Sequence, residues 1–432
     1  MRDQDPSSAG SDGRLSTREA AELLGVKPET VYAYVSRGQL SSRRSPGGRG
    51  STFDTEEVEA LARRNRREGA GRPGGPGGSG GELSVRTRLT LIDGDRYYFR
   101  GVDAVELAGR HTYEEVAEWL WTGRLRPGAA FVAPEASVAV ARRAVAALPG
   151  HATPTDRLRV AAIAAATADP LRFDLSEDAV LGTARTLIPT LVAALPPAGG
   201  GQDDTGPVAR RLWARLTGRE ADAARLRVLD TALALLVDHD LAASTIAVRV
   251  AASARAHPYA AVSAGLGVLE GPLHGAASGF AHELLLAVLD RGGATPVIAD
   301  ELRAGRRIPG LGHRIYPGED PRAGALFALL EGIPHAAPAL AAARDIVATA
   351  ARHTPLHANV DLALAVLTAS SGMPASAGET VFAVARTAGW IAHALEEYGE
   401  RPLRMRPRGL YAGPRPPRPL PGPDAGGSPG HS

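Results

Sequence analysis

The segment IPGLGHRIYPGEDPR, residues 308–322, interrupts a long stretch of helical sequence. Its six glycine and proline residues are too many for a helix, so we expect a loop. The loop presents His313 and Arg314 together, followed by Asp320 and Arg322. Loops on rigid helices often hold binding and catalytic groups, and the planar guanidinium of Arg322 suits a carboxylate. Taken alone, however, the segment could equally be a surface loop with solvated charges.

The sequence on both sides of this loop is rich in alanine and leucine at helical spacing. Between Val102 and Leu395 such patterns follow one another with short glycine or proline breaks, and several are apolar around most of the helix. Helices of that kind are buried inside a large bundle, so the sequence predicts a mainly α fold. The clearest expected helices cover residues 135–148, 155–168, 176–195, 222–239, 243–256, 259–269 and 339–352.

Composition limits the classes of protein that this chain can belong to. Its 432 residues suggest two or three domains, and 44% hydrophobic with 22% charged residues is ordinary for a soluble globular protein. No apolar run approaches the roughly 18 residues of a membrane span, and the polar start lacks a signal-peptide core. We therefore expect a cytoplasmic protein with no membrane partner. The absence of cysteine excludes disulfides, thiolate catalysis and cysteine metal sites.

Residues 14–65 carry a pattern of two short helices joined by a tight turn. Ser16 or Thr17 can cap the first helix, Gly25 ends it, and Pro28 opens the second. An arginine- and glycine-rich stretch from Arg43 to Arg49 would form a wing, and residues 53–61 a closing helix. The segment resembles the winged helix-turn-helix of the excisionase and MerR type, and we place this domain at residues 14–68. The resemblance implies that helix 28–37 enters the major groove of DNA. The DNA-contacting residues would be Thr30, Tyr32, Arg37, Arg43, Arg44 and Arg49.

Charge adds little to the DNA-binding hypothesis. The first 81 residues hold 13 basic and 11 acidic side chains, and the remaining residues hold 36 of each. The surplus at the front is small, so a helical protein-interaction module with solvated arginines remains the alternative. Residues 69–81, GAGRPGGPGGSGG, read as a flexible linker, and the Pro/Gly-rich residues 414–432 as a disordered tail. After the linker, Asp93-Gly94 flanked by alternating apolar residues predicts a β-hairpin.

Candidate chemical groups occur in four segments. They are DHDLAAST at 238–245, GPLHGAAS at 271–278, the 308–322 loop, and HANVDLALAVL at 357–367; Arg386 and Arg406 follow nearer the end. Each has a plain structural explanation when it is taken singly. A histidine after a loop proline can be a buried hydrogen-bonded ring, and an aspartate at a helix start favours the helix dipole. An arginine inside an apolar helix can pair with a buried acid.

Taken together, the segments resemble the citrate synthase family. The order GPLHG, PGLGHR-x-Y-x-x-x-DPR, NVD, R-T-x-G-W-I-A-H and RPR-x-x-Y-x-G is typical of that family, and LTLIDGDRYYFRGVDAVELA resembles its N-terminal segment. The likeness runs from about Leu83 to Gly413, and we place a catalytic domain at residues 82–413. It implies an almost entirely helical fold in which a small domain, about residues 273–379, closes over a large one. It also implies a homodimer without a metal or other cofactor.

The resemblance assigns roles for condensing acetyl-CoA with oxaloacetate. Asp361 is the implied base that removes a methyl proton, and this needs simultaneous stabilisation of the forming enolate. His274 is the implied neutral donor to the thioester oxygen, and His313 polarises the ketone of oxaloacetate. The implied substrate-binding residues are His239, Arg322, Arg386 and Arg406. Arg406 would come from the partner subunit, with Arg401 as the alternative.

The chain departs from the family pattern at four positions. Asp240 and Ala242 stand where glutamate and asparagine are common, and Ala276 and Ser278 stand in a stretch that commonly reads H-G-G-A-N. Loss of amides beside the histidines puts the rate or the acyl-chain preference in doubt. Two alternatives stay open: a 2-methylcitrate synthase using propionyl-CoA, since one methylene discriminates by only about 1–3 kcal/mol, and a DNA-binding regulator whose second domain senses a metabolite.

Overall fold

The structure is a computed structural model with two compact units, residues 1–85 and 86–432, which are described separately. It describes residues 14–24, 26, 28–36, 39–44, 51–61, 85–199, 205–271, 274–275, 277–353, 355–407 and 410–415. The predicted linker, nearly all of the predicted tail and the candidate DNA contacts Arg37 and Arg49 lie outside these residues, as does the side chain of Arg44.

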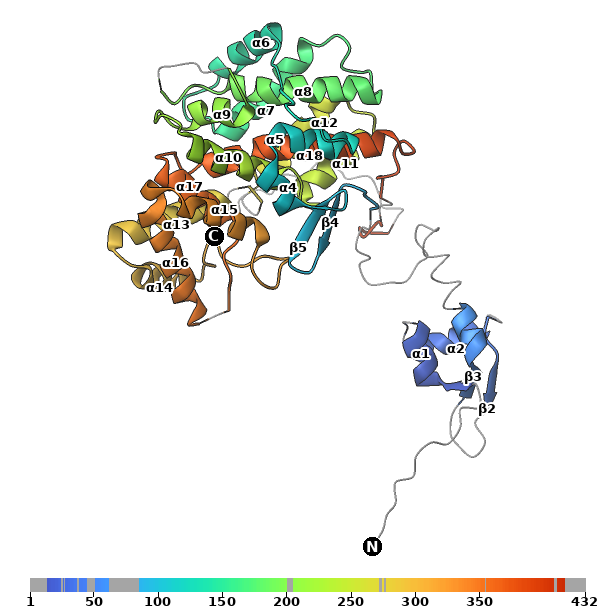
Figure 1. Ribbon diagram of the computed structural model, residues 1–432. Coiled ribbons are helices and arrows are strands. Elements are labelled where there is room, and N and C mark those ends of the chain that lie inside the picture. Colours follow the sequence, from blue (N-terminus) through green and yellow to red (C-terminus); the bar gives the residue numbers. More distant parts are fainter. Residues whose placement is uncertain are drawn as a thin grey trace, which may run out of the picture. The chain divides into compact units, whose positions relative to one another are not determined.

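The first unit is a small helix-turn-helix domain with a three-stranded antiparallel sheet (Figure 1). A reciprocal cap opens α1, because the Ser16 N–H donates to Glu19 and the Glu19 N–H donates to the Ser16 hydroxyl. The fold therefore confirms the two predicted helices and adds a first strand, whereas residues 45–49 of the predicted wing lie outside the described residues. Its elements are β1 (Arg14–Ser16), α1 (Thr17–Leu24), α2 (Pro28–Ser36), β2 (Ser42–Arg44), β3 (Ser51–Asp54) and a helix at 55–61, in sheet order β1-β3-β2.

One boundary in this domain was predicted wrongly. Phe53 was expected in the closing helix but lies in β3. There it pairs with Leu15 of β1 on one side and with Ser42 of β2 on the other. Its ring is fully buried, and burial in the sheet outweighs the helical pattern of the following residues. Asp54 instead caps the helix by accepting the N–H groups of the residues at 56 and 57. Of the candidate DNA contacts, Thr30, Tyr32 and Arg43 have exposed side chains.

The second unit begins with the predicted hairpin. β4 (Thr90–Asp93) pairs with β5 (Arg96–Phe99) through a two-residue turn in which Gly94 has φ of 61°. The short β6 (Val102–Asp103) extends this antiparallel sheet. The buried side chains of the hairpin point toward the helical core, since Tyr97 and Phe99 are at most 1% exposed. The hairpin is thus an integral part of the helical unit.

The remainder of this unit is helical, as the sequence predicts. Every expected helix is present, with ends that differ by at most three residues from those expected. The helices are α4 (Ala104–Arg110), α5 (Tyr113–Thr122), α6 (Glu135–Ala146), α7 (Pro154–Thr167), α8 (Glu177–Ala194), α9 (Val208–Leu216), α10 (Ala223–Leu236), α11 (Ala243–Ser253), α12 (Pro258–Leu269), α13 (Ala277–Arg291), α14 (Ala294–Arg303), α15 (Pro321–Glu331), the 3₁₀ turn η1 (Pro334–Ala336), α16 (Ala337–Ala351), α17 (Val360–Ser370) and α18 (Ala377–Tyr398).

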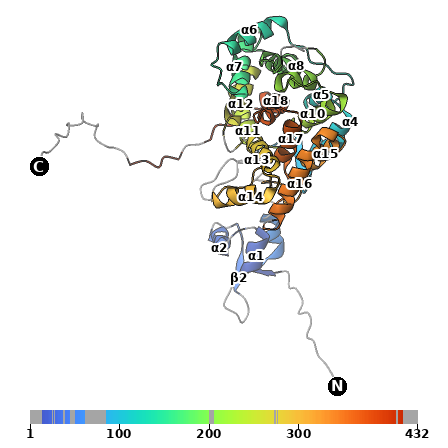
Figure 2. The ribbon, with the colours of Figure 1, turned by 90° about the vertical axis from the view of Figure 1, so that its left-hand side faces the viewer.

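Helix α18 is the centre of this arrangement. It packs against α5, α8, α10, α11 and α12, and also against α13 and α17. Helices α13–α17 gather at one end of the unit and α6–α9 at the other (Figures 1 and 2). Gly389 allows α18 to lie directly on the segment after α10, because an added Cβ would sit 2.0 Å from the carbonyl oxygen of Val237. This close approach places Arg386 and His393 of α18 beside Asp238.

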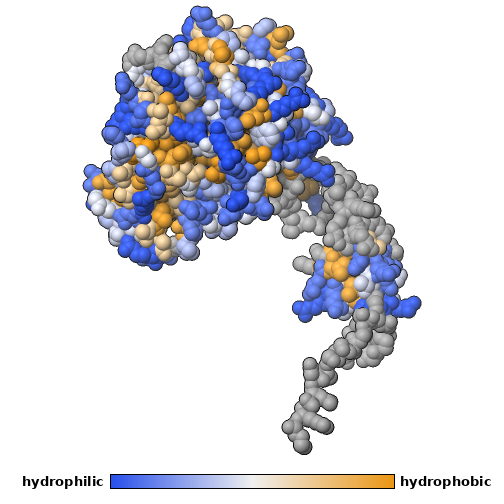
Figure 3. Space-filling view, viewed as in Figure 1, coloured by the Kyte–Doolittle hydropathy of each residue, from blue (hydrophilic) through white to orange (hydrophobic). Residues whose placement is uncertain are grey.

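Most of the apolar side chains of this unit are buried, but some lie at the surface. Figure 3 shows apolar residues over the region where Figure 1 places α13, α14 and α16, and Leu286, Leu289 and Leu302 are exposed there. Along the part of the chain that is described, no single helix is long and apolar enough to span a membrane; one sharply bent pair, Pro321–Glu331 with Pro334–Ala351, passes by length and composition only.

Candidate active site

Two of the predicted histidines meet a tyrosine in the interior. His239 follows α10, and its Nε2 lies 2.8 Å from the hydroxyl of Tyr316. The ring of His313 stands 5.3 Å from that of His239 and 4.8 Å from that of Tyr316, between centroids. Burial and the nearby arginines, Arg322 and then Arg386, lower the pKa of His239 well below its usual value. His239 is therefore a neutral ring.

The hydrogen bonds of His313 define which ring nitrogen holds the proton. Its Nδ1 accepts the backbone N–H groups of Ile315 at 3.1 Å and Tyr316 at 3.3 Å. Two backbone donors at Nδ1 place the proton of a neutral ring on Nε2, so Nη2 of Arg322, which can only donate, is a charged neighbour of Nε2 and not its hydrogen-bond donor. Burial and the charge of Arg322, whose Nη2 lies 3.3 Å from Nε2, lower the pKa of His313 to about 4. At neutral pH the ring can therefore donate one hydrogen bond from Nε2 without carrying charge.

A buried ion pair joins the loop to the start of α17. Arg322 lies in the first turn of α15 and not in the expected loop, because Asp320 caps that helix and the loop ends there, two residues earlier than expected. The Asp320 carboxylate accepts from Nε of Arg322 at 2.9 Å and Nη2 at 2.8 Å, and from the N–H of Val360 at 3.0 Å. Burial alone would raise the pKa of Asp320, but the charge and hydrogen bonds of Arg322 outweigh it and hold the pKa low. The pair fixes Arg322 in one orientation.

Asp361 occupies the first turn of α17, beside the same loop. Asn359 caps this helix through its side-chain oxygen, and its amide nitrogen donates to the carbonyl of Gly312 at 2.8 Å. The backbone N–H of Asn359 donates to the carbonyl of Gly310 at 3.0 Å. These bonds hold Asp361 at a fixed place relative to His313. Burial raises the pKa of Asp361 to about 6, although the charge of Arg322 opposes the shift.

His274 approaches the site from the segment before α13. Its Nε2 lies 2.7 Å from the hydroxyl of Ser244, and its ring centroid lies 5.9 Å from that of Phe382 on α18. Burial and the charge of Arg386 lower the pKa of His274. All three candidate histidines are thus held in the neutral form, and neutral imidazoles can donate hydrogen bonds without adding positive charge.

Arg386 is the cation best suited to an incoming anion. Its side chain is 1% exposed, its Nε donates to the carbonyl of Leu236 at 2.9 Å, and its Cζ lies 4.5 Å from the ring centroid of Phe382. Within the described residues, neither Nη1 nor Nη2 has a hydrogen-bond partner. Burial lowers the pKa of Arg386 to about 10, so it stays charged at neutral pH. A buried guanidinium with two unused nitrogens fits a carboxylate.

The last two candidate arginines do not join this cluster within one chain. Arg406 has an exposed side chain, and its backbone N–H donates to the carbonyl of Leu403. Arg401 is also exposed. The segment that carries them is anchored by the N–H of Leu403 on the carbonyl of Ser253 at 2.7 Å. Their roles stay predictions.

Several residues of the site lie in the quoted segments but were assigned no role from the sequence. Tyr316 and Asp320 lie inside the quoted loop, and Asp238 stands next to His239, so proximity to a candidate was an available signal. Thr90 and His393 lie inside two of the quoted motifs, but each contacts Asp238 across about 150 residues of sequence, and no local pattern indicates that contact. The hairpin residue Tyr97 also reaches the site, where its ring lies 5.7 Å from that of His239 and its hydroxyl donates to the carbonyl of Leu235.

The positions that depart from the family pattern have distinct environments. Ala242 is the N-cap residue of α11 and provides no side-chain hydrogen bond there. Asp240 adopts a left-handed conformation with φ of 56°, which aspartate tolerates better than most residues. Ser278 is 3% exposed, and its hydroxyl has no partner among the described residues. Ala276 lies outside them.

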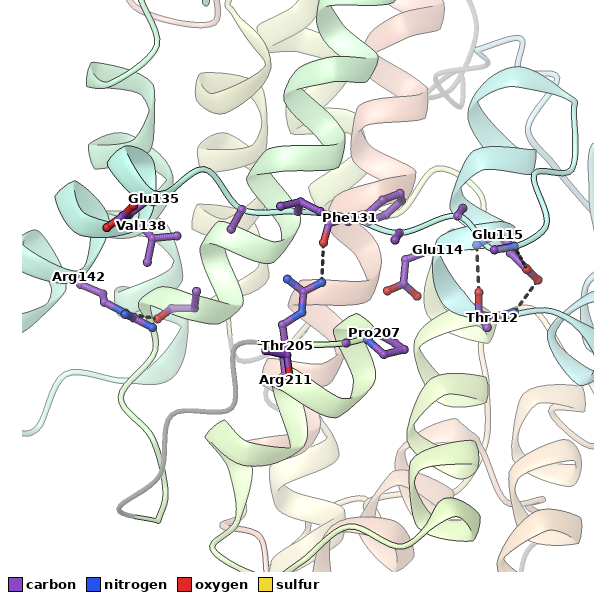
Figure 4. Close-up of a pocket in the computed structure, with 17 residues that line it drawn as sticks. Thr112, Glu114, Glu115, Phe131, Glu135, Val138, Arg142, Thr205, Pro207 and Arg211 are labelled. Atoms are coloured by element: carbon purple, nitrogen blue, oxygen red, sulfur yellow. Dashed lines mark hydrogen bonds between the residues drawn. The ribbon is translucent and has the colours of Figure 1, made fainter.

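Two other kinds of site were considered. The described residues contain no group of three or more histidine and acidic side chains that could hold a metal ion. A separate cavity of about 690 Å³ lies between α5, α6, α8 and α9, and Figure 4 shows the carboxyl of Glu114 and the guanidinium of Arg211 reaching into it from opposite sides. This cavity contains none of the candidate residues.

Comparisons with known proteins identify the family of each unit. The family described as citrate synthase, C-terminal domain, matches residues 78–408, and a helix-turn-helix domain matches residues 14–66. The citrate synthase of Haloferax volcanii is 32% identical over 356 residues, which cover 77% of this chain and 94% of that protein. The citrate synthase of Acidithiobacillus ferridurans is 30% identical, covering 73% of this chain and 89% of that one.

A solved structure gives the same result for the fold. The crystal structure of the citrate synthase from Pyrobaculum aerophilum superposes with a TM-score of 0.67 at 27% identity, covering 78% of this chain and 92% of that one. The region that matches the family model, residues 78–408, contains every candidate residue from His239 to Arg406. The chain therefore belongs to the citrate synthase family and carries a helix-turn-helix domain in front of the enzyme.

Proposed function

We propose that the second unit condenses acetyl-CoA with oxaloacetate and water to give citrate and CoA. The observation that carries this proposal is Arg386, a buried guanidinium with two unused nitrogens, placed among imidazoles that are kept neutral. Oxaloacetate is a dianion, and Arg322 and Arg386 supply fixed positive charge for it. His239 lines the same space and, with Tyr316, limits how the dianion can lie.

The proposed reaction uses three side chains. Asp361 takes a proton from the acetyl methyl group while His274 donates a hydrogen bond to the thioester oxygen. With the Ser244 hydroxyl donating to Nε2, the His274 ring carries its proton on Nδ1, where it is free for that oxygen. The resulting enol carbon attacks the ketone carbon of oxaloacetate, and His313 stabilises the developing alkoxide from Nε2. Water then cleaves the thioester of the condensed intermediate, which releases CoA.

The acyl group is the part of this proposal that needs its own experiment. Ser278 is small and buried, and a Cβ added at Gly378 of α18 would lie 2.7 Å from its hydroxyl oxygen, so there is little free space on that side. We expect acetyl-CoA to give a higher kcat/KM than propionyl-CoA, by about 10- to 100-fold, since one methylene is worth about 1–3 kcal/mol. CoA release with oxaloacetate can be followed by a thiol reagent, because the chain has no cysteine.

Three outcomes of this assay are informative. A preference for propionyl-CoA would instead make the protein a 2-methylcitrate synthase. No CoA release from either thioester would contradict the proposed activity and favour a regulator whose second unit only binds a metabolite. Release with acetyl-CoA that depends on oxaloacetate supports the proposal.

We further propose that the enzyme is a homodimer acting in the cytoplasm. Helix α12 packs on both α7 and α11, and these three helices and the loop before α8 carry exposed apolar side chains. Such a patch is typical of an interface, and a second copy would also bring an exposed Arg406 to a neighbouring site. The patch consists of Ile163, Leu171, Phe173, Val250 and Val268.

For the first unit we propose DNA binding through α2 and the wing. The support is the helix-turn-helix fold with an exposed Thr30, Tyr32 and Arg43. Deleting residues 1–81 should abolish DNA affinity and leave kcat and KM almost unchanged, because a glycine-rich linker cannot transmit a rigid rearrangement. Fluorescence anisotropy with genomic fragments at several salt concentrations would measure binding, which should weaken steeply as salt rises.

The deletion also separates two alternatives. Absence of DNA binding by the full-length protein at low salt would leave the first unit as a protein-interaction module. Loss of catalysis in the truncated protein would show that the enzyme needs its front domain. In a dimer, two tethered helix-turn-helix units would bind paired half-sites more tightly than one, because the linker raises their effective concentration.

A further inference from the structure

Arg322 and Arg386 each have an acidic neighbour, but only Arg322 forms hydrogen bonds with it. Asp320 closes onto Arg322 with two hydrogen bonds, which occupy Nε and Nη2. Arg386 has no such pair, although the fully buried Asp238 lies close enough for each charge to shift the pKa of the other. Asp238 thus compensates the charge of Arg386 without occupying its terminal nitrogens.

Both oxygens of Asp238 are engaged elsewhere. Its Oδ2 accepts a short hydrogen bond from the Thr90 hydroxyl, and its Oδ1 lies 3.2 Å from Nε2 of His393. Burial alone would raise the pKa of Asp238, but His393, Arg386 and Thr90 together outweigh it and keep the pKa low. The carboxylate is therefore charged and held at both ends.

The direction of the His393 hydrogen bond follows from its other neighbour. Nδ1 of His393 lies 2.8 Å from Nη1 of Arg249, and an arginine can only donate. Nδ1 must accept from Arg249, so the ring donates to Asp238 from Nε2. Arg249 is itself fixed, because it is 1% exposed and pairs with Glu396 at 2.8 Å and Glu397 at 3.3 Å. His393 is thus held as a donor to Asp238.

We propose that Thr90 and His393 are positioning residues that hold Asp238 away from Arg386, so that the guanidinium stays open for a carboxylate of the substrate. Without them, the Asp238 carboxylate would form its most favourable hydrogen bonds by turning toward Nη1 and Nη2 of Arg386. Asp320 forms such a pair with Arg322. A substrate carboxylate would then have to displace an internal one. The inference rests on the proposed function, and it gives the hairpin that follows the linker a part in substrate binding through Thr90.

The test compares two substitutions of one hydroxyl. Thr90→Val keeps the shape of the side chain and removes the donor, whereas Thr90→Ser keeps the donor. We expect Thr90→Val to raise the KM for oxaloacetate about 10- to 100-fold, the effect of weakening one charge-assisted contact, with kcat changed much less. Thr90→Ser should stay close to the wild type. Calorimetric titration with oxaloacetate, without acyl-CoA, should show the same loss of affinity.

A double variant distinguishes closure of Asp238 from a general loss of structure. If Asp238 blocks Arg386 in Thr90→Val, then adding Asp238→Asn removes the blocking charge, and the double variant should bind oxaloacetate more tightly than Thr90→Val alone. A merely structural role of Thr90 predicts further weakening in the double variant, which would overturn the inference. So would an unchanged KM in Thr90→Val. If the wild type itself neither binds oxaloacetate nor releases CoA, the proposed function fails, and that result is separate from these.

Discussion

Replacing Asp361 by asparagine should stop condensation while leaving oxaloacetate binding nearly intact. The amide keeps the shape of the carboxylate but cannot take the methyl proton, and loss of a general base costs about 100- to 10,000-fold in rate. Oxaloacetate affinity should persist because the arginines that hold it are unchanged. The measurement is kcat from CoA release, together with calorimetric binding of oxaloacetate. Turnover within about tenfold of the wild type would remove Asp361 from the role of base.

A thermal unfolding measurement checks independently that Asp361→Asn is folded, because the raised pKa of Asp361 predicts whether the substitution raises or lowers the stability. Burial raises the pKa of Asp361 to about 6, above its ordinary value, so the folded protein binds that proton more tightly than the unfolded chain does. Near neutral pH the buried, ionised carboxylate therefore lowers the free energy of unfolding. This loss disappears as the pH falls below the ordinary pKa of an aspartate, 3.8, where the carboxyl is protonated in both states. A neutral amide removes it, so the Tm of Asp361→Asn at pH 7 should equal or exceed that of the wild type.

The same pKa shapes the pH dependence of the wild-type enzyme. The base must be ionised, so kcat/KM should fall about tenfold per pH unit below pH 6. His313, with a pKa of about 4, stays neutral through that range and adds no second step there. A profile that is flat between pH 5 and pH 7 would contradict the assignment.

Local patterns in the sequence were sufficient for most of the helices, and the motifs named the candidate catalytic residues. Helical spacing predicts α6 to α8 and α10 to α12, because each buries one or more apolar faces along its own length. The loop expected at 308–322 was evident from its glycine and proline residues, although it ends at Asp320 because Pro321 opens α15. Phe53 shows the limit of this approach, because its sheet partners lie at residues 15 and 42 and no local pattern specifies them.

The electrostatics of the site could not be predicted in the same way. The raised pKa of Asp361 and the unused nitrogens of Arg386 depend on burial, which results from packing of the whole unit. Thr90, Asp238 and His393 come from the hairpin, the end of α10 and α18, and only the folded chain brings them together. A motif identifies the reacting groups, whereas the groups that orient them are distributed through the sequence.

Arg386→Leu should produce the second large effect, a rise of at least about 100-fold in the KM for oxaloacetate. The variant removes a buried cation whose two free nitrogens can each form a charge-assisted hydrogen bond, and such bonds contribute about 1.5–3 kcal/mol. Arg406→Leu should raise the KM in the same direction if Arg406 completes the site. Steady-state kinetics with varied oxaloacetate measures both, and a KM within threefold of the wild type for Arg386→Leu would remove that residue from substrate binding.

Mixing the two variants tests whether one site draws on two subunits. If Arg406 serves the partner's site, a mixed dimer of Arg386→Leu and Arg406→Leu has one site that lacks both arginines and one that lacks neither. Free exchange of equal amounts makes half of the dimers mixed, so about a quarter of all sites should regain wild-type KM. If Arg406 serves its own subunit, every site lacks one arginine and nothing is regained. The matched control is Arg401→Leu, also exposed and five residues away: rescue with that variant in place of Arg406→Leu would identify Arg401 as the residue that crosses the interface.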